Sequence, residues 1–284
     1  MAKLIDGKAV SAEVKTRVAE ETARLKAQGI APGLAVVLVG DDPASRIYVN
    51  NKKKACEAVG IYSEEYALPA ETSQKELLDL IETLNRKPEI HGILVQSPLP
   101  GGLDEAAVVD RINPQKDVDA FHAHNVGLLT QGRPIFQPCT PAGIVELIRS
   151  TGTEIAGKHC VVIGRSNIVG KPMALLLLQN NGTVTICHSK TKDLQWIASQ
   201  ADILISAVGK AKFVTAEMVK EGAVVIDVGM NRTEDGKLCG DVDFAQVEPL
   251  ASYITPVPGG VGPMTIAKLL ENTVTAAKLQ NGKV

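Results

Sequence analysis

The sequence predicts an α/β protein. Amphipathic helical segments alternate with short β-branched apolar runs through most of its 284 residues, which is the pattern of βαβ units and a parallel sheet. The apolar run at 160–163 is followed by a glycine-rich turn and a helical segment, an order typical of dinucleotide-binding domains. The hydrophobic fraction of 45% suffices for the cores of one large or two ordinary domains.

The first half of the chain predicts one complete α/β unit. Its expected elements are helices over 11–28, 43–59 and 74–85 and strands over 34–39 and 92–96. Turn signals N-P, Q-G and R-P follow before residue 133, and the next helix is expected over 140–150. We therefore place a domain boundary near residue 139.

The second half predicts four more strands and two helices, and it ends in a helix that follows a loop rich in glycine and proline. These elements are strands over 160–163, 183–187, 203–208 and 223–228 and helices over 173–179 and 264–280.

The segment H-C-V-V-I-G-R-S-N-I-V-G-K-P at 159–172 looks like an altered dinucleotide-binding turn. Gly164 and Gly170 follow the apolar run at once, but Ser166 stands where G-x-G-x-x-G has its second glycine. The next strand ends in H-S-K, where an NAD-binding fold usually has an acidic residue for the ribose hydroxyl. Such a carboxylate would repel a 2′-phosphate, whereas Ser189 and the nearby Arg165 would attract one. The pattern therefore predicts NADP as the cofactor.

Two domains follow from these elements. Residues 1–139 are expected to form an N-terminal α/β catalytic domain that the C-terminal helix 264–284 completes. Residues 140–263 are expected to form a Rossmann-type NADP-binding domain with a parallel sheet. We expect a cleft between the two domains.

One lysine in the helix expected over 43–59 faces the wrong way for a surface residue. Asp42 is a good N-cap, Pro43 suits the first helical position and Gly60 suits the position after the helix, so the helical register is well defined. At 100° per residue, Lys52 falls inside an apolar arc whose other members are Ala44, Tyr48, Ala55 and Val59. Burial would lower the pKa of this lysine toward neutrality. Alternatively, Lys52 snorkels past the edge of the core and Tyr48 simply packs.

Polar residues after the strand expected over 92–96 are further candidates. Gln96 lies at a carboxyl end of the sheet, where ligands bind in open α/β folds, although it can equally be an ordinary loop residue. Asp117 and Asp119 in K-D-V-D could each accept hydrogen bonds from an amino-pyrimidine edge. By default each is a solvated turn residue, and this is the preferred interpretation for Asp117. A metal ion bound by His122 and His124 would need further ligands, which the sequence does not show, so we expect no metal site.

The segment T-P-V-P-G-G-V-G-P-M-T at 255–265 is unusually rich in glycine and proline. Such a loop is stiff and lets a ligand approach the backbone closely, and Pro263 is placed to start the last helix. A tight crossover loop without a ligand is the equal alternative.

The composition points to small-molecule partners. The net charge is −2 and the longest basic run is 52–54, so neither nucleic acid nor an anionic membrane is expected as a partner. The N-terminus lacks a signal-peptide core, and the apolar runs are too short to span a bilayer, so we expect a cytoplasmic protein. The five cysteines are widely spaced and should be reduced and mostly buried.

Seven motifs, in this order along nearly the whole chain, closely resemble the bifunctional methylenetetrahydrofolate dehydrogenase/methenyltetrahydrofolate cyclohydrolase family. They are Y-V-N-N-K, I-L-V-Q-S-P-L-P, K-D-V-D, G-R-S-N-I-V-G-K-P, H-S-K-T, V-I-D-V-G-M-N-R and Y-I-T-P-V-P-G-G-V-G-P-M-T. The resemblance implies NADP-dependent oxidation of 5,10-methylenetetrahydrofolate and hydrolysis of the methenyl product to 10-formyltetrahydrofolate. It also implies a homodimer, a role in one-carbon metabolism and purine biosynthesis, and the two-activity form without a synthetase domain.

The resemblance also implies roles for particular residues. Lys52 would be catalytic, oriented by Gln96, with Tyr48 stacking on the folate and Asp119 binding the pterin. The remaining implied contacts are Pro258, Gly259, Gly260 and Pro263 with the folate and nicotinamide, Gly164, Arg165 and Ser166 with the phosphates, Ser189 with the 2′-phosphate side, and Met230 with the dinucleotide through its backbone.

Ala120 departs from the family, which usually has glycine after the aspartate. If this position requires a positive φ or close approach by the substrate, alanine would strain it and could shift Asp119.

Two other classes of protein remain as alternatives. A shikimate-type or amino-acid-type NADP-dependent dehydrogenase would need an acid/base pair, which Lys52 and Asp119 could imitate. A non-catalytic NADP-sensing module would leave an inward lysine beside a tyrosine unexplained.

Overall fold

The computed structural model describes residues 1–233 and 235–283, and the chain divides into two compact units. Unit 1 consists of Met1–Ala12 and Thr140–Thr265, and unit 2 consists of Glu13–Cys139 and Ile266–Val284. This division assigns residues 1–12 to the unit that holds the glycine-rich turn, whereas the sequence analysis assigned them to the N-terminal domain. The reason is that the backbone of the first strand pairs with that unit's sheet, and Lys3 N donates to Ser252 O at 2.9 Å.

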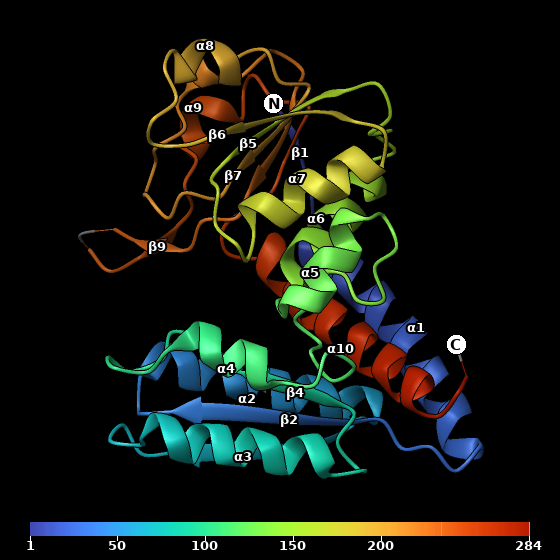
Figure 1. Ribbon diagram of the computed structural model, residues 1–284. Helices are drawn as coiled ribbons and strands as arrows, with labels where there is room; N and C mark the ends of the chain where they lie inside the picture. Colours follow the sequence, from blue (N-terminus) through green and yellow to red (C-terminus); the bar gives the residue numbers. More distant parts are fainter. Residues whose placement is uncertain (234, 284) are drawn as a thin grey trace. The chain divides into compact units, whose positions relative to one another are not determined.

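Unit 1 contains a six-stranded, fully parallel sheet in the order β1-β11-β8-β7-β5-β6 (Figure 1). These strands are β1 (Lys3–Leu4), β5 (His159–Ile163), β6 (Thr183–Cys187), β7 (Ile203–Ser206), β8 (Val224–Asp227) and β11 (Tyr253–Ile254). A short antiparallel hairpin, β9 (Asn231–Arg232) and β10 (Leu238–Cys239), follows β8. The parallel sheet and its crossover helices confirm the predicted α/β class.

The helices of unit 1 cover both faces of this sheet. On one face, alternate residues of the central strands, such as Val161, Leu204 and Val225, pack against the α8 and α9 region in one apolar core. On the other face lie α6 and α7 (Figure 1). The bounds are α6 (Cys139–Ser150), α7 (Gly170–Gln179), α8 (Leu194–Ala198), the 3₁₀ helix η1 (Ala216–Met218) and α9 (Phe244–Val247).

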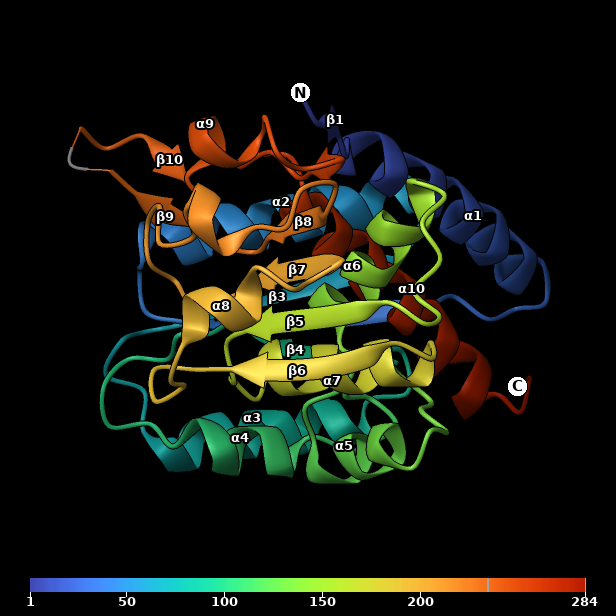
Figure 2. The ribbon, with the colours of Figure 1, turned by 90° about the horizontal axis from the view of Figure 1, so that it is seen from above.

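Unit 2 contains a three-stranded parallel sheet in the order β3-β2-β4. Its elements are β2 (Gly33–Val39), β3 (Tyr62–Leu68), β4 (Gly92–Val95), α2 (Pro43–Val59), α3 (Gln74–Arg86), α4 (Glu105–Arg111) and α5 (Ala123–Thr130). Residues Ala35, Val37 and Val39 of β2 pack with α3 and α4 in one core, and α2 lies on the opposite side of the sheet from α3 (Figure 2). Since β2 is buried along its whole length, it reads as a continuous apolar run.

Two long helices contribute residues to both units. They are α1 (Gly7–Ala27) and α10 (Val261–Gln280). The last helix begins at Val261, three residues before the predicted start, so Pro263 lies within its first turn. Proline is tolerated there because the first N–H groups of a helix have no intrahelical acceptor.

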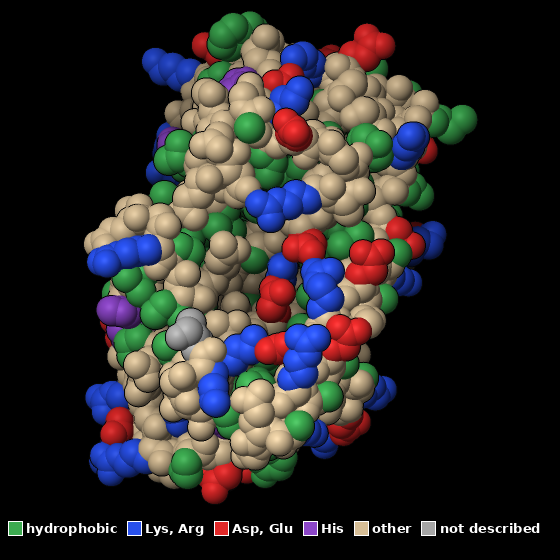
Figure 3. All heavy atoms as spheres, turned by 90° about the vertical axis from the view of Figure 1, so that its right-hand side faces the viewer, with side chains coloured by type: hydrophobic (Ala, Val, Ile, Leu, Met, Phe, Trp, Pro, Cys, Tyr) green, Lys and Arg blue, Asp and Glu red, His purple; other side chains and the backbone are tan. Residues whose placement is uncertain are grey.

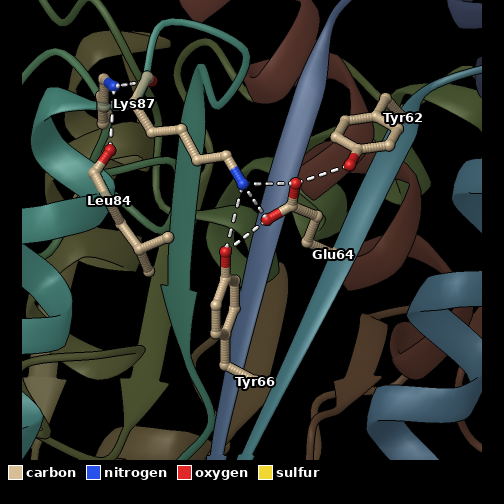
Figure 4. Close-up of polar contacts among 6 residues, drawn as sticks. Tyr62, Glu64, Tyr66, Leu84 and Lys87 are labelled. Atoms are coloured by element: carbon tan, nitrogen blue, oxygen red, sulfur yellow. Dashed lines mark hydrogen bonds and ion pairs between the residues drawn. The ribbon is translucent and has the colours of Figure 1, made fainter.

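Strand β3 is the edge of its sheet, and the sequence analysis missed it. It reads Y-S-E-E-Y-A-L, which lacks the apolar run of its neighbours. On one face of β3 the Glu64 carboxylate accepts hydrogen bonds from the Tyr62 and Tyr66 hydroxyls and from Lys87 Nζ, at 2.6 and 2.7 Å for the lysine (Figure 4). These donors lower the pKa of Glu64 to about 2, with Lys87 the largest cause. This polar cluster therefore stabilises the strand in addition to the packing of Tyr66 and Leu68 against the apolar core of unit 2.

Acidic and basic side chains are interspersed on the face drawn in Figure 3. Among residues 1–233 and 235–283, no helix has both the length and the apolar character that a membrane span requires.

Candidate active site

Helix α2 has the predicted bounds, and the predicted caps are present. The Asp42 side chain accepts a hydrogen bond from Ser45 N at 2.7 Å, and Gly60 ends the helix with a φ of 77°. The buried face differs from the predicted arc by about one position, because Ala44 is exposed and Tyr48 half-buried. The buried residues are Ser45, Val49, Lys52, Ala55, Cys56 and Val59.

Lys52 is buried in unit 2, with 8% of its surface exposed. Its Nζ donates a hydrogen bond of 2.8 Å to Gln96 Oε1, which the strand β4 presents from its carboxyl end. The orientation of the Gln96 amide is fixed because Nε2 donates to Ser97 O at 2.6 Å and the backbone N–H donates to Val37 O. The oxygen of the amide is therefore held toward the lysine, as a residue that orients Lys52 would require.

Burial favours the neutral forms of Lys52 and of the ionisable groups near it. Burial lowers the pKa of Lys52, and the negative charge of Asp119 opposes the shift. Burial raises the pKa of Asp119 to about 6, while Lys52 lowers it and Asp117 raises it further. The pKa of Cys56 is raised to about 12 by burial, so this thiol carries no charge near neutral pH. Lys52 and Asp119 therefore interact electrostatically, and each opposes the effect of burial on the pKa of the other.

Tyr48 lies one helical turn before Lys52 and is half-buried. Its position leaves part of the phenol at the surface, and burial of the remainder raises its pKa. The hydroxyl is therefore protonated at neutral pH.

Asp117 is buried, with 2% exposure, so its interpretation as a solvated turn residue is wrong. Its carboxylate accepts hydrogen bonds of 2.8 Å from His122 N and from Asn125 Nδ2. Burial raises the pKa of this carboxyl, and the two donors oppose that shift. Asp117 thus closes the loop that carries Asp119.

The two histidines in this loop have structural roles. His122 is the N-cap of α5, and its Nδ1 accepts a hydrogen bond of 3.0 Å from His124 N. Within residues 1–233 and 235–283, no group of three or more His, Cys, Asp or Glu side chains is placed to hold a metal ion.

Cys139 and Asn272 belong to the surroundings of Asp119, and the sequence analysis missed both. The Cys139 thiol contributes a hydrogen bond that lowers the pKa of Asp119 and lies 3.4 Å from Val118 O. Asn272 Nδ2 donates to Val118 O at 2.8 Å and to Gln137 O at 2.9 Å. A buried asparagine in a long amphipathic helix and a lone cysteine give no sequence signal, because only the fold brings them to this loop.

Two glycines in the glycine-rich turn of unit 1 lie too close to neighbouring backbone atoms for a side chain to fit. A Cβ on Gly164 would lie 2.4 Å from Ala207 O, and one on Gly170 would lie 2.3 Å from Gly164 O. Gly164 also has a φ of 134°, which residues with a side chain rarely adopt. Ser166 Oγ accepts hydrogen bonds from Val169 N at 3.2 Å and Gly170 N at 3.3 Å. Since both lone pairs are used, its O–H proton remains to be donated outward.

The neighbouring strand ends beside this turn. Ile163 of β5 is paired with Cys187 of β6, so Arg165 and Ser189, which are both exposed, follow adjacent strands at one edge of the sheet. The turn after β6 is fixed by His188, whose Nδ1 accepts a hydrogen bond of 3.1 Å from Lys190 N. An exposed cation and hydroxyl at this edge suit a phosphate group.

The glycine- and proline-rich loop is packed against the start of α1. A Cβ on Gly7 would lie 1.7 Å from Gly260 O, and one on Gly260 would lie 2.7 Å from the Thr255 Cβ. Gly259 has a φ of 110°. Met230, which follows β8, is 47% exposed, and its Cε would lie 3.8 Å from a Cβ on Gly262. Both segments therefore belong to unit 1, where they follow the adjacent parallel strands β8 and β11.

The fold and these residues define a two-unit α/β dehydrogenase with a Rossmann-type nucleotide unit. The catalytic domain of tetrahydrofolate dehydrogenase/cyclohydrolase matches residues 5–119, and the NAD(P)-binding domain of the same family matches residues 138–281. The chain belongs to the tetrahydrofolate dehydrogenase/cyclohydrolase family.

Individual relatives agree with this assignment. Bifunctional protein FolD from Polaromonas naphthalenivorans (strain CJ2) is 60% identical over 277 residues, which cover 98% of this chain and 99% of that protein. The bifunctional FolD enzyme from Campylobacter jejuni is 52% identical with a TM-score of 0.96, covering 98% of this chain and 99% of that one. The Trypanosoma brucei FolD, solved with NADP and an inhibitor, is 40% identical with a TM-score of 0.93, covering 98% of each chain.

Ala120 has a φ of 61° and is 1% exposed, so the position does require left-handed backbone. Replacing Ala120 by glycine removes about 1–2 kcal/mol of strain. Two effects oppose this gain in stability. Loss of the buried methyl group destabilises the fold by about 0.8 kcal/mol, and the greater conformational freedom of glycine in the unfolded chain destabilises it by about 0.5–1 kcal/mol. We expect Ala120→Gly to change the free energy of unfolding by less than about 1 kcal/mol, as measured by urea unfolding.

Ala120→Val should instead lose at least about 2 kcal/mol, because a β-branched side chain is strained at this φ and overfills a buried site. The matched control is Ala35→Val, which adds the same atoms to a buried alanine within strand β2. A loss of less than about 1 kcal/mol in Ala120→Val would contradict a left-handed backbone at Ala120.

Proposed function

We propose that the Lys52 site and the glycine-rich edge of unit 1 carry the two reactions of the family. In the first, NADP⁺ accepts a hydride from 5,10-methylenetetrahydrofolate to give the methenyl cation. In the second, water adds to that cation, a proton is released, and a C–N bond breaks to give 10-formyltetrahydrofolate. The observation that carries the proposal is the buried Lys52, hydrogen-bonded to an oriented Gln96 and opposed by Asp119.

The oxidation step needs little from the protein beyond positioning. The carbon that loses hydride lies between two nitrogens, so the product charge is delocalised and no hydroxyl proton has to be removed. A dedicated base is therefore unnecessary for this step. The substrate must be held, and we assign Asp119 to the pterin and Tyr48 to stacking on the folate, with Pro258, Gly259, Gly260 and Pro263 bordering the folate and nicotinamide.

The hydrolysis step requires proton transfer, and Lys52 is suited to it. Burial favours the neutral amine, which can accept the proton that the attacking water loses. Gln96 fixes the direction in which the amine points, because its own amide is anchored to Ser97 O. Asp119 stabilises the ammonium once it forms. General acid/base catalysis of this kind typically contributes about 10²–10⁴ in rate.

The preference for NADP⁺ rests on the edge formed by the ends of β5 and β6. Gly164 lets the turn pack against Ala207 O, and we assign it to the phosphates together with Ser166, which has an O–H to donate. Arg165 and Ser189 are exposed after the adjacent strands β5 and β6. The residues that follow β6 are His188, Ser189 and Lys190, so no carboxylate opposes a 2′-phosphate there. We assign a backbone contact with the dinucleotide to Met230. The T. brucei relative was solved with NADP.

The alternative of a shikimate-type or amino-acid-type dehydrogenase has less support. It depends on Lys52 and Asp119 acting as an acid/base pair on an alcohol or amine. The hydrogen bond from Lys52 goes to Gln96 instead, and both halves of the chain match the folate family.

We further propose that the protein works in the cytosol as a homodimer joined through the β3 edges. Alternate residues of β3 pair with β2, as in the bond from Tyr62 N to Pro32 O, so Ser63, Glu65 and Ala67 direct their N–H and C=O groups to the outer edge. A seven-residue edge without proline is a template for pairing with a second copy. The cysteines are free, as expected in a reducing compartment.

Lys52→Met should reduce hydrolysis of methenyltetrahydrofolate by at least about 100-fold. NADP⁺ binding should persist, because Lys52 belongs to unit 2 and methionine fills its buried site without a charge. The measurement is the loss of methenyl absorbance, together with NADP⁺ titration. Lys53→Met, which changes an exposed lysine on the same helix, serves as control. If Lys52→Met hydrolysed methenyltetrahydrofolate at the wild-type rate, the catalytic role assigned to Lys52 would be wrong.

Arg165→Gln should raise the KM for NADP⁺ by about 10- to 100-fold, since a charge-assisted hydrogen bond is worth about 1.5–3 kcal/mol. The KM for NAD⁺, which has no 2′-phosphate, should stay within about threefold. Assays with both nucleotides side by side measure this preference. Lys171→Gln in the same turn removes an exposed positive charge and should leave both constants unchanged. Equal losses with the two nucleotides would contradict a 2′-phosphate contact.

Glu65→Pro should convert the homodimer to a monomer, because it removes an outward N–H without breaking the ladder between β2 and β3. Glu65→Gln keeps that N–H and should remain dimeric, and it also controls for loss of the 3.8 Å ion pair with Arg46. Sedimentation velocity distinguishes the two states, and circular dichroism verifies folding. A folded Glu65→Pro variant that sediments as a dimer would place the interface elsewhere.

A further inference from the structure

We propose that Asp241 is a positioning residue of the nucleotide site, holding two of its loops without touching the ligand. This inference rests on the proposed NADP⁺ site in unit 1. Asp241 is completely buried. It follows the hairpin β9–β10 in a segment, G-D-V-D, that neither the sequence analysis nor the proposed mechanism uses.

The Asp241 carboxylate gathers five hydrogen-bond donors. Oδ2 accepts from Val208 N at 2.7 Å, Gly209 N at 3.2 Å and the Ser206 hydroxyl at 3.3 Å. Oδ1 accepts from Lys210 N at 3.0 Å and Asn231 Nδ2 at 2.9 Å. Three consecutive backbone N–H groups converging on one carboxylate fix the path of loop 206–210, because each is left without an acceptor if the carboxylate is lost.

This loop lies directly against the dinucleotide turn. It begins at the carboxyl end of β7, and Ala207 N donates to Ile163 O at 2.8 Å. Ala207 O is also the atom that a Cβ on Gly164 would meet at 2.4 Å. A shift of loop 206–210 would therefore displace Gly164 and the turn that we assign to the phosphates.

The second loop that Asp241 holds carries Met230. The side chain of Asn231, the next residue, donates to Asp241, so the carboxylate ties the segment after β8 to the segment after β7. These are the two segments that follow adjacent strands at the ligand-binding edge of the sheet.

A second buried carboxylate fixes Asp241 itself. Asp227, at the end of β8, accepts hydrogen bonds of 2.9 Å from Asp241 N, Val242 N and Gly229 N. The contacts are reciprocal, since a Cβ on Gly240 would lie 1.8 Å from Asp227 Oδ2 and one on Gly229 would lie 2.2 Å from Asp241 Oδ1. Both glycines are therefore needed for the two carboxylates to reach these N–H groups.

Asp241→Asn tests the proposal with almost no change in volume. The amide keeps one acceptor oxygen but turns an NH₂ group toward donors that need an acceptor, so the loops must shift. We expect the Kd and KM for NADP⁺ to rise at least about tenfold, with kcat changed less. Since Asp241 does not recognise the 2′-phosphate, NAD⁺ binding should weaken by the same factor. Hydrolysis of methenyltetrahydrofolate, which consumes no nucleotide, should stay within about twofold.

The matched control is Asp243→Asn, two residues further along the same segment. Asp243 is partly exposed, and its side chain accepts a hydrogen bond from Gln246. This variant loses the same charge and should bind NADP⁺ as the wild type does. Nucleotide titration by calorimetry measures the Kd values in the full chain, and steady-state assays measure KM, kcat and the rate of hydrolysis.

The outcomes are distinguishable. A folded Asp241→Asn variant with wild-type affinity for both nucleotides would overturn the inference about Asp241, as would equal losses in Asp243→Asn. If Asp241→Asn does not fold, Asn231→Ala takes its place. It removes one donor and should raise the Kd for NADP⁺ about threefold or more, and an unchanged Kd would again overturn the inference. Failure of the wild type to bind NADP⁺ would instead contradict the proposed function.

Discussion

Charges buried at the carboxyl ends of parallel strands must find hydrogen-bond partners, and the loops of both units are folded around this requirement. In unit 1, Asp227 and Asp241 accept eight hydrogen bonds between them, from the end of β7 and from the segments that follow β7, β8 and β10. In unit 2, Asp117 closes the loop after α4, and Lys52 meets Gln96 at the end of β4. An unpaired buried charge would cost several kcal/mol, so each group dictates the conformation of the chain near it.

The same requirement explains why three positions of unit 1 are glycines. Gly229 and Gly240 lie so close to the two carboxylates that no side chain fits, and Gly164 lies against the loop that Asp241 holds. Their role is thus close approach of backbone to backbone or to a carboxylate. The glycine-rich turn is one part of a larger arrangement, in which two buried carboxylates fix the loops beside the turn.

The sequence could predict the elements whose signals are local. Helix α2 has its predicted bounds because Asp42, Pro43 and Gly60 act on adjacent backbone groups, and the buried strands are continuous apolar runs. Strand β3 was missed because a polar cluster around Glu64 stabilises it, and the burial of Asp117 was missed because an aspartate in a polar loop is usually solvated. Lys52 could be singled out by its helical register, whereas Cys139 and Asn272 reach Asp119 only through long-range folding. The buried acids of unit 1 gave no local signal either.

The burial of Lys52 also bears on how one site can serve two reactions. The oxidised intermediate is a cation, and an ammonium held beside it would repel it. Burial lowers the pKa of Lys52, which reduces that repulsion and favours the neutral amine that the proposed hydrolysis uses as its base. Asp119 works in the opposite sense, because its charge stabilises a cation on either the substrate or the lysine. With the pKa of Asp119 raised to about 6, its carboxylate remains ionised at neutral pH. In the proposed mechanism, this pair would tolerate the charge that oxidation creates and take up the proton that hydrolysis releases.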